Sequence, residues 1–521
     1  MNASYAECKS LPQERSILDI INCEEWASDH FITVYTQGRP PVRMTLGELQ
    51  GTVRRVASWL MDRGLKSGDR IGILAHNSLE WILLDLACIR QGIVTAGFEP
   101  EAFASRVDLT DTYDLQLLVC DRLCAAAVDA GERFVPLQSI PTIGTVEDLA
   151  IPLPPPYRFH LDECSTIKFT SGSTGKAKGL GATVGSIDQS IRGVQALFHH
   201  GPKDKLFVFL PLSLLQQRYW IYSAIAFGHD IVVTAPSLAF DVLHREAPTV
   251  VMGVPAFFTT LKERIEHAVL GAGTQAADLR AVARTILGPN VRYLWTGSAP
   301  VHPDVLTFFF DMCGIPLFEG YGMNEICIAT KNHPGAYRIG SVGQPLDGVK
   351  VMVDSAGIVR VKRRHPVNTR YLYAPQGASE QVFADDGTVV TGDLGYIDPD
   401  GFLYITGRVD DVVVLENGRN IYVREIEERI ARIAGVAQAI VFGFGRPTLG
   451  ALVHPLPGAQ IDILRLKLQA AASECDAQFG AIVMIDHPFT ADNGLLTSQG
   501  KPRRTAILAA YTAVIEAAYG G

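Results

Sequence analysis

The chain has 521 residues, of which 47% are hydrophobic and 19% charged, with a net charge of −9. This composition excludes a disordered chain, and the modest negative charge argues against a nucleic-acid binder that gains affinity by releasing counterions. The length exceeds what one core usually holds, so we expect one large domain and at least one smaller domain.

The first part of the chain, up to about residue 300, alternates between helix-like and strand-like patterns. Residues 45–64 open with a capping box, Thr45 and Glu48, and continue with helical apolar spacing. Residues 69–75 resemble a buried strand, and residues 79–92 a helix that ends at Gly92. This alternation predicts an α/β fold of layered, largely parallel sheets and helices. Further short apolar runs end in Pro or Gly, at residues 205–211, 230–236, 249–255 and 291–297.

The pattern changes near residue 345. Short strand-like runs separated by Gly- and Asp-rich turns predict a β-rich subdomain over about 345–406. Within it, the basic run "VKRRH" at 361–365 is interpreted as a solvated strand edge. Residues 409–521 read as a small α+β domain, with a helix, two strands, a second helix and a terminal helix after Pro502. We therefore predict an N-terminal domain over 1–408 and a C-terminal domain over 409–521.

Cysteine usage and the N-terminus bear on the compartment. The nine cysteines are scattered and form no CxxC pair, which favours free thiols in a reducing cytosol over disulfides or a zinc site. The polar start "MNASYAECKSLPQERS" lacks the order of a secretory signal, and no apolar run approaches the ~18 residues of a membrane span. We expect a cytoplasmic protein without integral membrane association or a nucleic-acid partner.

The segment "FTSGSTGKAKG", residues 169–179, follows a strand-like run and precedes a helix-like one at 186–198. Thr170 and Ala177 stand where a Walker loop needs Gly and Ser or Thr, so that interpretation fails. Its glycine amides, hydroxyls and lysines could still bind phosphate. By itself the segment is equally compatible with a mobile surface loop.

Four later segments carry side chains suited to a nucleotide. "FEGYGMNE" holds Tyr321, which could stack on a purine, and Glu325, which could hold Mg²⁺. "TGDLGYID" holds Asp393, a carboxylate that could accept from ribose hydroxyls, and "YITGRVDD" holds Arg408. "NGLLTSQGKPRR" holds Lys501. Each signal is weak alone, because a core aromatic, a turn cap or a solvated lysine would look the same.

Together and in this order, the five segments resemble the AMP-forming adenylating superfamily, which includes acyl-CoA synthetases, luciferase-like enzymes and adenylation domains of nonribosomal peptide synthetases. The resemblance covers nearly the whole chain. Ala177 departs from a usual Pro, and Asn324 from a usual Thr. Pro211 and Arg218 resemble a pattern of long-chain acyl-CoA synthetases. The chain also resembles the amide-ligase-like branches of the superfamily.

The resemblance implies a role for each matched residue. Lys501, Glu325 and Lys178 would be catalytic, with Glu325 as the Mg²⁺ ligand and Asp410 as the hinge of a mobile C-terminal domain. The implied ATP- or AMP-binding residues are Thr170, Ser171, Gly172, Ser173, Thr174, Gly175, Lys178, Gly297, Ser298, Ala299, Tyr321, Gly322, Asn324, Asp393 and Arg408.

The implied reaction joins ATP, Mg²⁺ and a small carboxylic acid to form an acyl-adenylate, which then passes to a nucleophile. The acceptor could be the thiol of CoA or of a carrier protein, or an amine, as in amide synthetases similar to coronafacate ligase. A silent nucleotide-binding sensor is a further alternative. The acid pocket is predicted to be apolar, with no Lys or Arg to pair a second carboxylate. Its expected residues are Val254, Pro255, Phe257, Gly297, Gly322 and Cys327.

Overall fold

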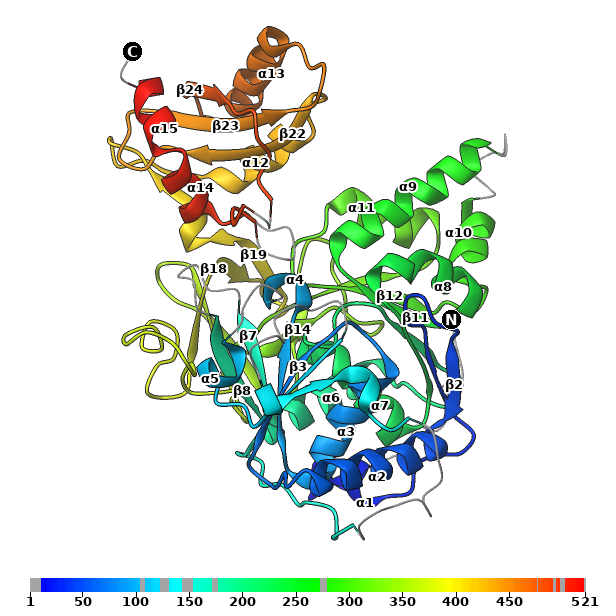
Figure 1. Cartoon of the computed structure of the whole chain (residues 1–521). Coiled ribbons are helices and arrows are strands. Elements are labelled where there is room, and N and C mark those ends of the chain that lie inside the picture. The colour runs from blue at the N-terminus through cyan, green and yellow to red at the C-terminus, as the bar shows by residue number, and fades with distance from the viewer. Residues whose placement is uncertain are drawn as a thin grey trace.

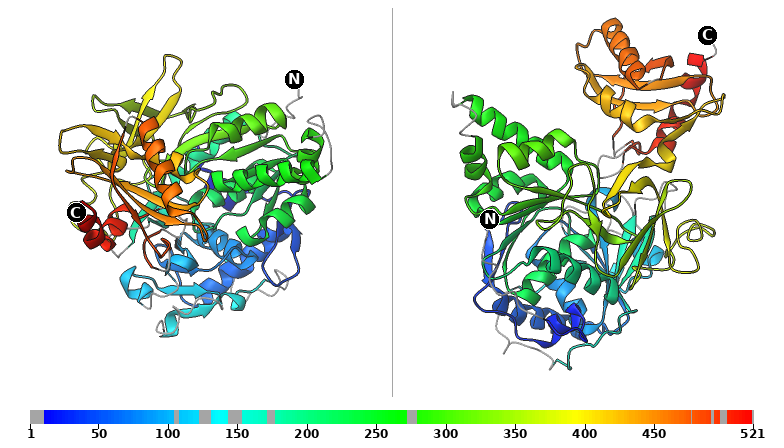
Figure 2. Two further views of the ribbon diagram at one scale, coloured as in Figure 1. Left: turned by 90° about the horizontal axis from the view of Figure 1, so that it is seen from above. Right: turned by 180° about the vertical axis from the view of Figure 1, so that it is seen from behind.

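The computed structural model describes residues 11–103, 108–121, 131–142, 153–170, 177–271, 279–475, 477–490, 493–496 and 502–519, without the side chains of residues 131, 170, 271, 410 and 420. Figure 1 shows a large N-terminal part and a smaller C-terminal part that stands at one end of it, and the view from behind in Figure 2 agrees. The fold is a mixed α/β arrangement of sheets and helices, as the alternating pattern predicts.

The larger sheet has nine strands in the order β15-β14-β13-β12-β11-β9-β10-β1-β2. Strands β1, β9, β10, β11, β12 and β13 pair in parallel, and β2, β14 and β15 add antiparallel edges. Its strands are β1 (Phe31–Val34), β2 (Val42–Thr45), β9 (Lys205–Val208), β10 (Asp230–Val233), β11 (Val250–Gly253), β12 (Tyr293–Thr296), β13 (Leu317–Met323), β14 (Cys327–Lys331) and β15 (Gln344–Pro345).

A second sheet has six strands in the order β6-β5-β3-β4-β7-β8, parallel except for the β7–β8 pair. Its strands are β3 (Arg70–Leu74), β4 (Val94–Phe98), β5 (Leu117–Cys120), β6 (Phe134–Pro136), β7 (Cys164–Thr170) and β8 (Lys178–Thr183).

Helices fill the space between these two sheets, as Figure 1 shows for α3, α6 and α7. One apolar core joins them to both sheets, because Ile73 of β3, Trp220 of α7 and Trp295 of β12 belong to the same buried cluster. The helices of the N-terminal part are α1 (Ile17–Cys23), α2 (Leu46–Asp62), α3 (Leu79–Gln91), α4 (Pro100–Phe103), α5 (Leu109–Thr112), α6 (Val184–Phe198), α7 (Leu215–Phe227), α8 (Ala239–Glu246), α9 (Pro255–Gly271), α10 (Leu279–Leu287) and α11 (Pro303–Thr307).

The segment around 169–179 differs from its expected strand-to-helix setting. Strand β8 intervenes, so the segment connects two antiparallel strands, with Thr170 opposite Lys178, and helix α6 begins only after the cap at Thr183. The sequence of β8, Lys178–Thr183, contains two glycines and little β-branched character, which hid the strand.

A four-stranded antiparallel sheet, β16-β17-β18-β19, forms the β-rich part of the chain. Its strands are β16 (Val349–Val353), β17 (Ile358–Arg363), β18 (Val389–Ile397) and β19 (Leu403–Arg408). The interpretation of residues 361–365 as a solvated strand edge is wrong, because β17 is an inner strand. The Arg363 guanidinium is buried and donates to the carbonyls of Ile326 and Ile328.

The C-terminal part has its own core, built on β22-β23-β24 and covered by helices α12 and α13. The predicted terminal helix is two short helices, α14 and α15, separated at Tyr511. Among the described residues, no helix combines the length and the apolar character needed to cross a bilayer. The elements are β20 (Val412–Val414), β21 (Asn420–Tyr422), α12 (Val423–Ala431), β22 (Val436–Phe442), β23 (Leu449–Pro455), α13 (Ile461–Glu474), β24 (Phe479–Met484), α14 (Arg504–Ala510) and α15 (Thr512–Tyr519).

Candidate active site

Three of the predicted nucleotide residues meet at one carboxylate. Asp393 of β18 accepts a hydrogen bond from the Tyr321 hydroxyl at 2.5 Å and one from the Arg408 guanidinium at 2.8 Å. Asp393 is opposite Arg408 in the β18–β19 pairing, whereas Tyr321 comes from the end of β13 in the large sheet. Burial raises the pKa of the Asp393 carboxyl, and the hydrogen bond from Tyr321 and the charge of Arg408 oppose that rise.

A second group joins Glu325 and Lys178 through a residue that the motifs do not include. The Tyr371 hydroxyl donates to Glu325 Oε1 at 2.7 Å, and Lys178 Nζ lies 4.9 Å from the centroid of the Tyr371 ring. Burial, followed by the nearby Glu325 charge, raises the pKa of Tyr371. Tyr371 therefore remains a hydroxyl donor that orients the carboxylate. No motif or periodicity marks this tyrosine in the sequence.

Glu325 could hold a magnesium ion only if other ligands, from ATP and water, complete the coordination shell. Glu325 is buried, and its Oε1 accepts the hydrogen bond from Tyr371, which leaves Oε2 for an ion. In the described part of the chain, no three His, Cys, Asp or Glu side chains gather closely enough to hold a metal by themselves. Mg²⁺ commonly takes one or two carboxylates and completes its shell with phosphate oxygens and water, so a single carboxylate suits an ion that arrives with ATP.

The segment after β12 is held in an unusual conformation. Ser298 has a φ of 70°, which a residue other than glycine seldom adopts. The Val301 N–H, just beyond Ala299, donates to the buried Glu319 carboxyl at 3.2 Å. A Cβ at Gly297 would approach the Gly320 carbonyl to 3.2 Å. This segment therefore runs closely beside β13, whose end carries Tyr321.

The turn after β13 is equally close-packed. A Cβ on Gly322 would lie 1.9 Å from the Cys327 carbonyl, so only glycine fits there. The strand pairing has a bulge between Tyr321 and Gly322, and Asn324 and Glu325 follow in the turn. The bulge redirects the chain at the point where the predicted nucleotide residues begin.

Three of the predicted acid-pocket residues pack with two different apolar clusters. Phe257 packs against Phe209 and Phe240 in one apolar cluster, and Val254 contacts the same cluster. Cys327 packs against a different cluster. The acid pocket therefore stays a prediction.

Cys327, one of the predicted pocket residues, has a lysine beside it. Its Sγ lies 3.5 Å from Lys168 Nζ and 3.0 Å from the Tyr219 hydroxyl. Lys168 belongs to β7, in a run that the sequence shows only as a strand before the phosphate-binding candidate. Its orientation depends on pairing between distant strands, which no local pattern reveals.

Some predicted residues lie outside the described part of the chain: Ser171, Gly172, Ser173, Thr174, Gly175 and Lys501. The backbone of Thr170 ends β7, and that of Asp410 lies in a short 3-10 turn, Val409–Asp411. Pro255 begins helix α9. The roles of all these residues stay predictions.

Arg218 has a role inside the domain. Its guanidinium is buried between α7 and α3 and donates to Asp85 Oδ1 at 2.8 Å, with side-chain exposures of 1% and 3%. It also donates to Thr166 of β7 at 3.0 Å. Arg218 therefore links two helices to the strand that precedes residues 171–176.

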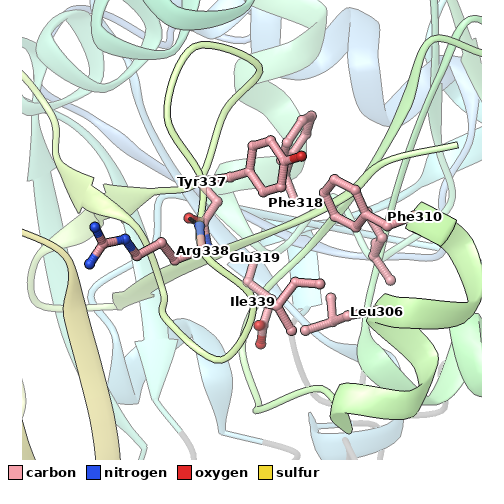
Figure 3. A pocket seen from close by; sticks show the side chains of 9 residues that line it. Leu306, Phe310, Phe318, Glu319, Tyr337, Arg338 and Ile339 are labelled. Carbon is pink, nitrogen blue, oxygen red and sulfur yellow. Dashed lines mark hydrogen bonds between the residues drawn. The ribbon is translucent and has the colours of Figure 1, made fainter.

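A small pocket beside β13 contains none of the predicted residues. Figure 3 shows the rings of Phe310, Phe318 and Tyr337 close together, while the Arg338 guanidinium points away. Arg338 forms ion pairs with Asp398 and Asp400. The positive charge beside this pocket is therefore already paired.

The chain is similar to curated ligases along most of its length. It is 27% identical to the long-chain-fatty-acid–CoA ligase FadD15 of Mycobacterium bovis, over 91% of this chain and 92% of that protein. It is 24% identical to the chloroplastic long-chain-fatty-acid–[acyl-carrier-protein] ligase AEE15 of Arabidopsis thaliana, over 92% and 83%. Identity to a 2-succinylbenzoate–CoA ligase of Bacillus cereus is 27%, over 77% and 80%.

Solved structures share the fold. The O-succinylbenzoate coenzyme A synthetase of Bacillus subtilis, in complex with AMP, gives a TM-score of 0.75 at 20% identity, covering 94% of this chain and 98% of that one. ATP-bound MatB of Rhodopseudomonas palustris gives 0.76 at 23% identity, covering 96% and 99%.

Family matches cover the chain in two blocks. Residues 22–364 match the AMP-binding enzyme family, and residues 410–521 match the AMP-binding enzyme C-terminal domain. The first block alone spans well over half of the chain and includes Tyr321 and Glu325, and the second begins at Asp410. This chain belongs to the AMP-binding enzyme family.

Proposed function

We propose that this protein is an ATP-dependent, AMP-forming acid–thiol ligase that activates a carboxylic acid and passes the acyl group to CoA or to a carrier-protein thiol. The observation that carries the proposal is the meeting of Tyr321, Asp393 and Arg408. Residues 72 positions apart, on different sheets, converge on one carboxylate. A buried carboxylate that two hydrogen bonds hold in place is suited to bind the neighbouring 2′- and 3′-hydroxyls of a ribose.

In the proposed first step, an acid carboxylate attacks the α-phosphorus of ATP, the bond to pyrophosphate breaks, and an acyl-adenylate forms. Negative charge grows on the phosphate oxygens, so fixed donors and cations near them lower the barrier. Lys178 and residues 170–175 would bind the β- and γ-phosphates, and Lys501 would neutralise the carboxylate and α-phosphate. Mg²⁺ held by Glu325 would supply further neutralising charge to the phosphates.

The adenine would lie between Tyr321 and residues Gly297, Ser298 and Ala299, with Gly322 and Asn324 at the turn. Tyr321 also holds Asp393 in place through its hydroxyl. The ring and the carboxylate therefore form one preorganised unit, which reduces the entropy lost on binding.

In the second step, a thiol attacks the acyl carbonyl, the bond to AMP breaks, and a thioester forms. We propose that the C-terminal domain rotates at Asp410 between the steps, so that Lys501 withdraws and another surface of that domain faces the adenylate. The names of the curated relatives, CoA ligases and an acyl-carrier-protein ligase, support a thiol as the acceptor over an amine.

The test offers an acid panel with ATP and Mg²⁺, and supplies CoA, amino acids and simple amines together. Pyrophosphate release and AMP formation should accompany an acyl-CoA mass in the product spectrum. An amide product would replace the thiol assignment with an amide ligase. Absence of pyrophosphate release with every acid, from folded protein that binds ATP, would refute the ligase proposal and favour a nucleotide sensor.

A further inference from the structure

Lys168 is a buried cation close to the predicted acid pocket. It lies in β7, is 4% exposed, and its Nζ approaches Cys327 Sγ at 3.5 Å. Among the described residues, no carboxylate forms an ion pair with it. An ammonium group has three donors and loses much hydration free energy on burial, so it needs acceptors that this thiol alone does not provide.

The surroundings add a second positive charge. The buried Arg363 guanidinium donates to the carbonyls of Ile326 and Ile328, the two neighbours of Cys327. Lys168 and Arg363 therefore place two positive charges beside the Cys327 segment. The hydroxyl of the fully buried Tyr219 lies 3.0 Å from the same sulfur. This region therefore has an excess of cations and favours an anionic or strongly accepting ligand.

Lys168 and Cys327 lie close in sequence to the segments that are predicted to bind Mg²⁺ and phosphate. Cys327 follows Glu325 by two residues, and its carbonyl lies directly beneath Gly322, where a Cβ would be only 1.9 Å away. Lys168 lies two residues before the end of β7, the strand that leads into residues 171–175. Through its contact with Cys327, Lys168 thus connects this strand to the turn that carries the magnesium candidate.

We propose that Lys168 determines substrate specificity, because its ammonium binds a second oxygen acceptor, a carboxylate above all, on the acid that the enzyme activates. The substrate class is then a carboxylic acid with an apolar body and a polar far end. This inference rests on the proposed function. In the absence of substrate, the Cys327 sulfur is the acceptor for Lys168, and the incoming oxygen takes its place.

The experiment compares matched acids in pyrophosphate release: butanoate with succinate, hexanoate with adipate, octanoate with suberate, and benzoate with terephthalate. The wild type should favour the dicarboxylate of at least one pair in kcat/KM by about 10- to 100-fold, the usual effect of one charge-assisted hydrogen bond. Lys168→Met keeps the apolar stem and should abolish that preference while it retains the activity with the monocarboxylate. Lys350→Met, at an exposed position of β16, is the matched control and should keep the preference.

Two outcomes overturn the proposal. One is a wild type that favours the monocarboxylate in every pair, a result that does not depend on whether the variant folds. The other is an equal loss with both members of a pair in Lys168→Met, which would place Lys168 at the reacting carboxylate instead.

Calorimetry separates this proposal from the proposed function. The acids are titrated into the protein without ATP, so binding is measured in the absence of catalysis. Dicarboxylate binding that is weakened about tenfold or more by Lys168→Met supports the role of Lys168 even if no acid releases pyrophosphate. Equal binding to the wild type and to Lys168→Met overturns it even if the enzyme proves to be a ligase.

Discussion

Glu319 is expected to make the stability of the N-terminal part depend on pH near neutrality. Its carboxyl is buried in β13, accepts from the Val301 N–H, and lies near the fully buried Lys331. Burial raises the pKa of Glu319 from 4.5 to about 7, although the bond from Val301 and the Lys331 charge oppose this. Burial also lowers the pKa of Lys331.

The direction in which stability changes with pH follows from proton binding to Glu319. Between pH 4.5 and about 7 the folded protein holds a proton on Glu319 that the unfolded chain releases. The stabilisation from this proton is complete below pH 4.5 and is lost as the pH rises through about 7. At about 1.4 kcal/mol per pKa unit, the loss amounts to about 3 kcal/mol.

Glu319→Gln keeps the volume and the acceptor for Val301 but cannot ionise. Compared with the wild type, the variant should therefore gain about 3 kcal/mol in the free energy of unfolding between about pH 4.5 and pH 8. Calorimetric unfolding of both proteins across this range measures the difference, and ionisable groups that do not interact with residue 319 cancel. For Glu416→Gln, at an exposed position, the free energy of unfolding should change with pH in the same way as for the wild type. A wild-type-to-variant difference that stays constant with pH would show that Glu319 does not titrate near neutrality.

Three further predictions concern nucleotide binding, the two half-reactions and the core. Asp393→Asn should weaken ATP binding by about 10- to 100-fold while acid binding and the exposed control Asp386→Asn stay near wild type, as calorimetry can measure. Lys501→Ala should abolish adenylate formation but leave thioester formation from a supplied acyl-adenylate largely intact; equal losses in both assays would contradict the two-step assignment. Arg218→Met should destabilise the protein by about 3 kcal/mol or more in chemical unfolding, because Asp85 then stays buried without its partner. Replacing Arg218 and Asp85 together by apolar residues should cost much less, and an equal cost would contradict the pairing argument.

Local signals in the sequence determined much of the secondary structure. The capping box at Thr45 and Glu48 begins α2 with both reciprocal hydrogen bonds. Gly92 ends α3 in the left-handed region, at a φ of 68°. These features depend on residues within one helical turn, so the sequence alone predicts them. The alternation of such elements was enough for the α/β class and the parallel sheets.

Local signals failed where the pairing partner decides the structure. Strand β8 has weak propensity and exists because β7 pairs with it. Arg363 appeared to belong to a solvated basic run, yet β17 is flanked on both sides and its inward face buries that guanidinium. A strand's edge or inner position is a property of the whole sheet, so the composition of the strand does not reveal it.

The sequence by itself determined the ordered motifs, and with them the family and the candidates Tyr321, Glu325, Asp393 and Arg408. Only the tertiary structure brought Tyr371 to Glu325, across 46 residues, and Lys168 to Cys327, across 159. Such contacts carry no periodic signal, because the distance between two side chains in space does not depend on their separation in the chain. The motifs omit Tyr371, which donates to Glu325, and Lys168, which contacts Cys327.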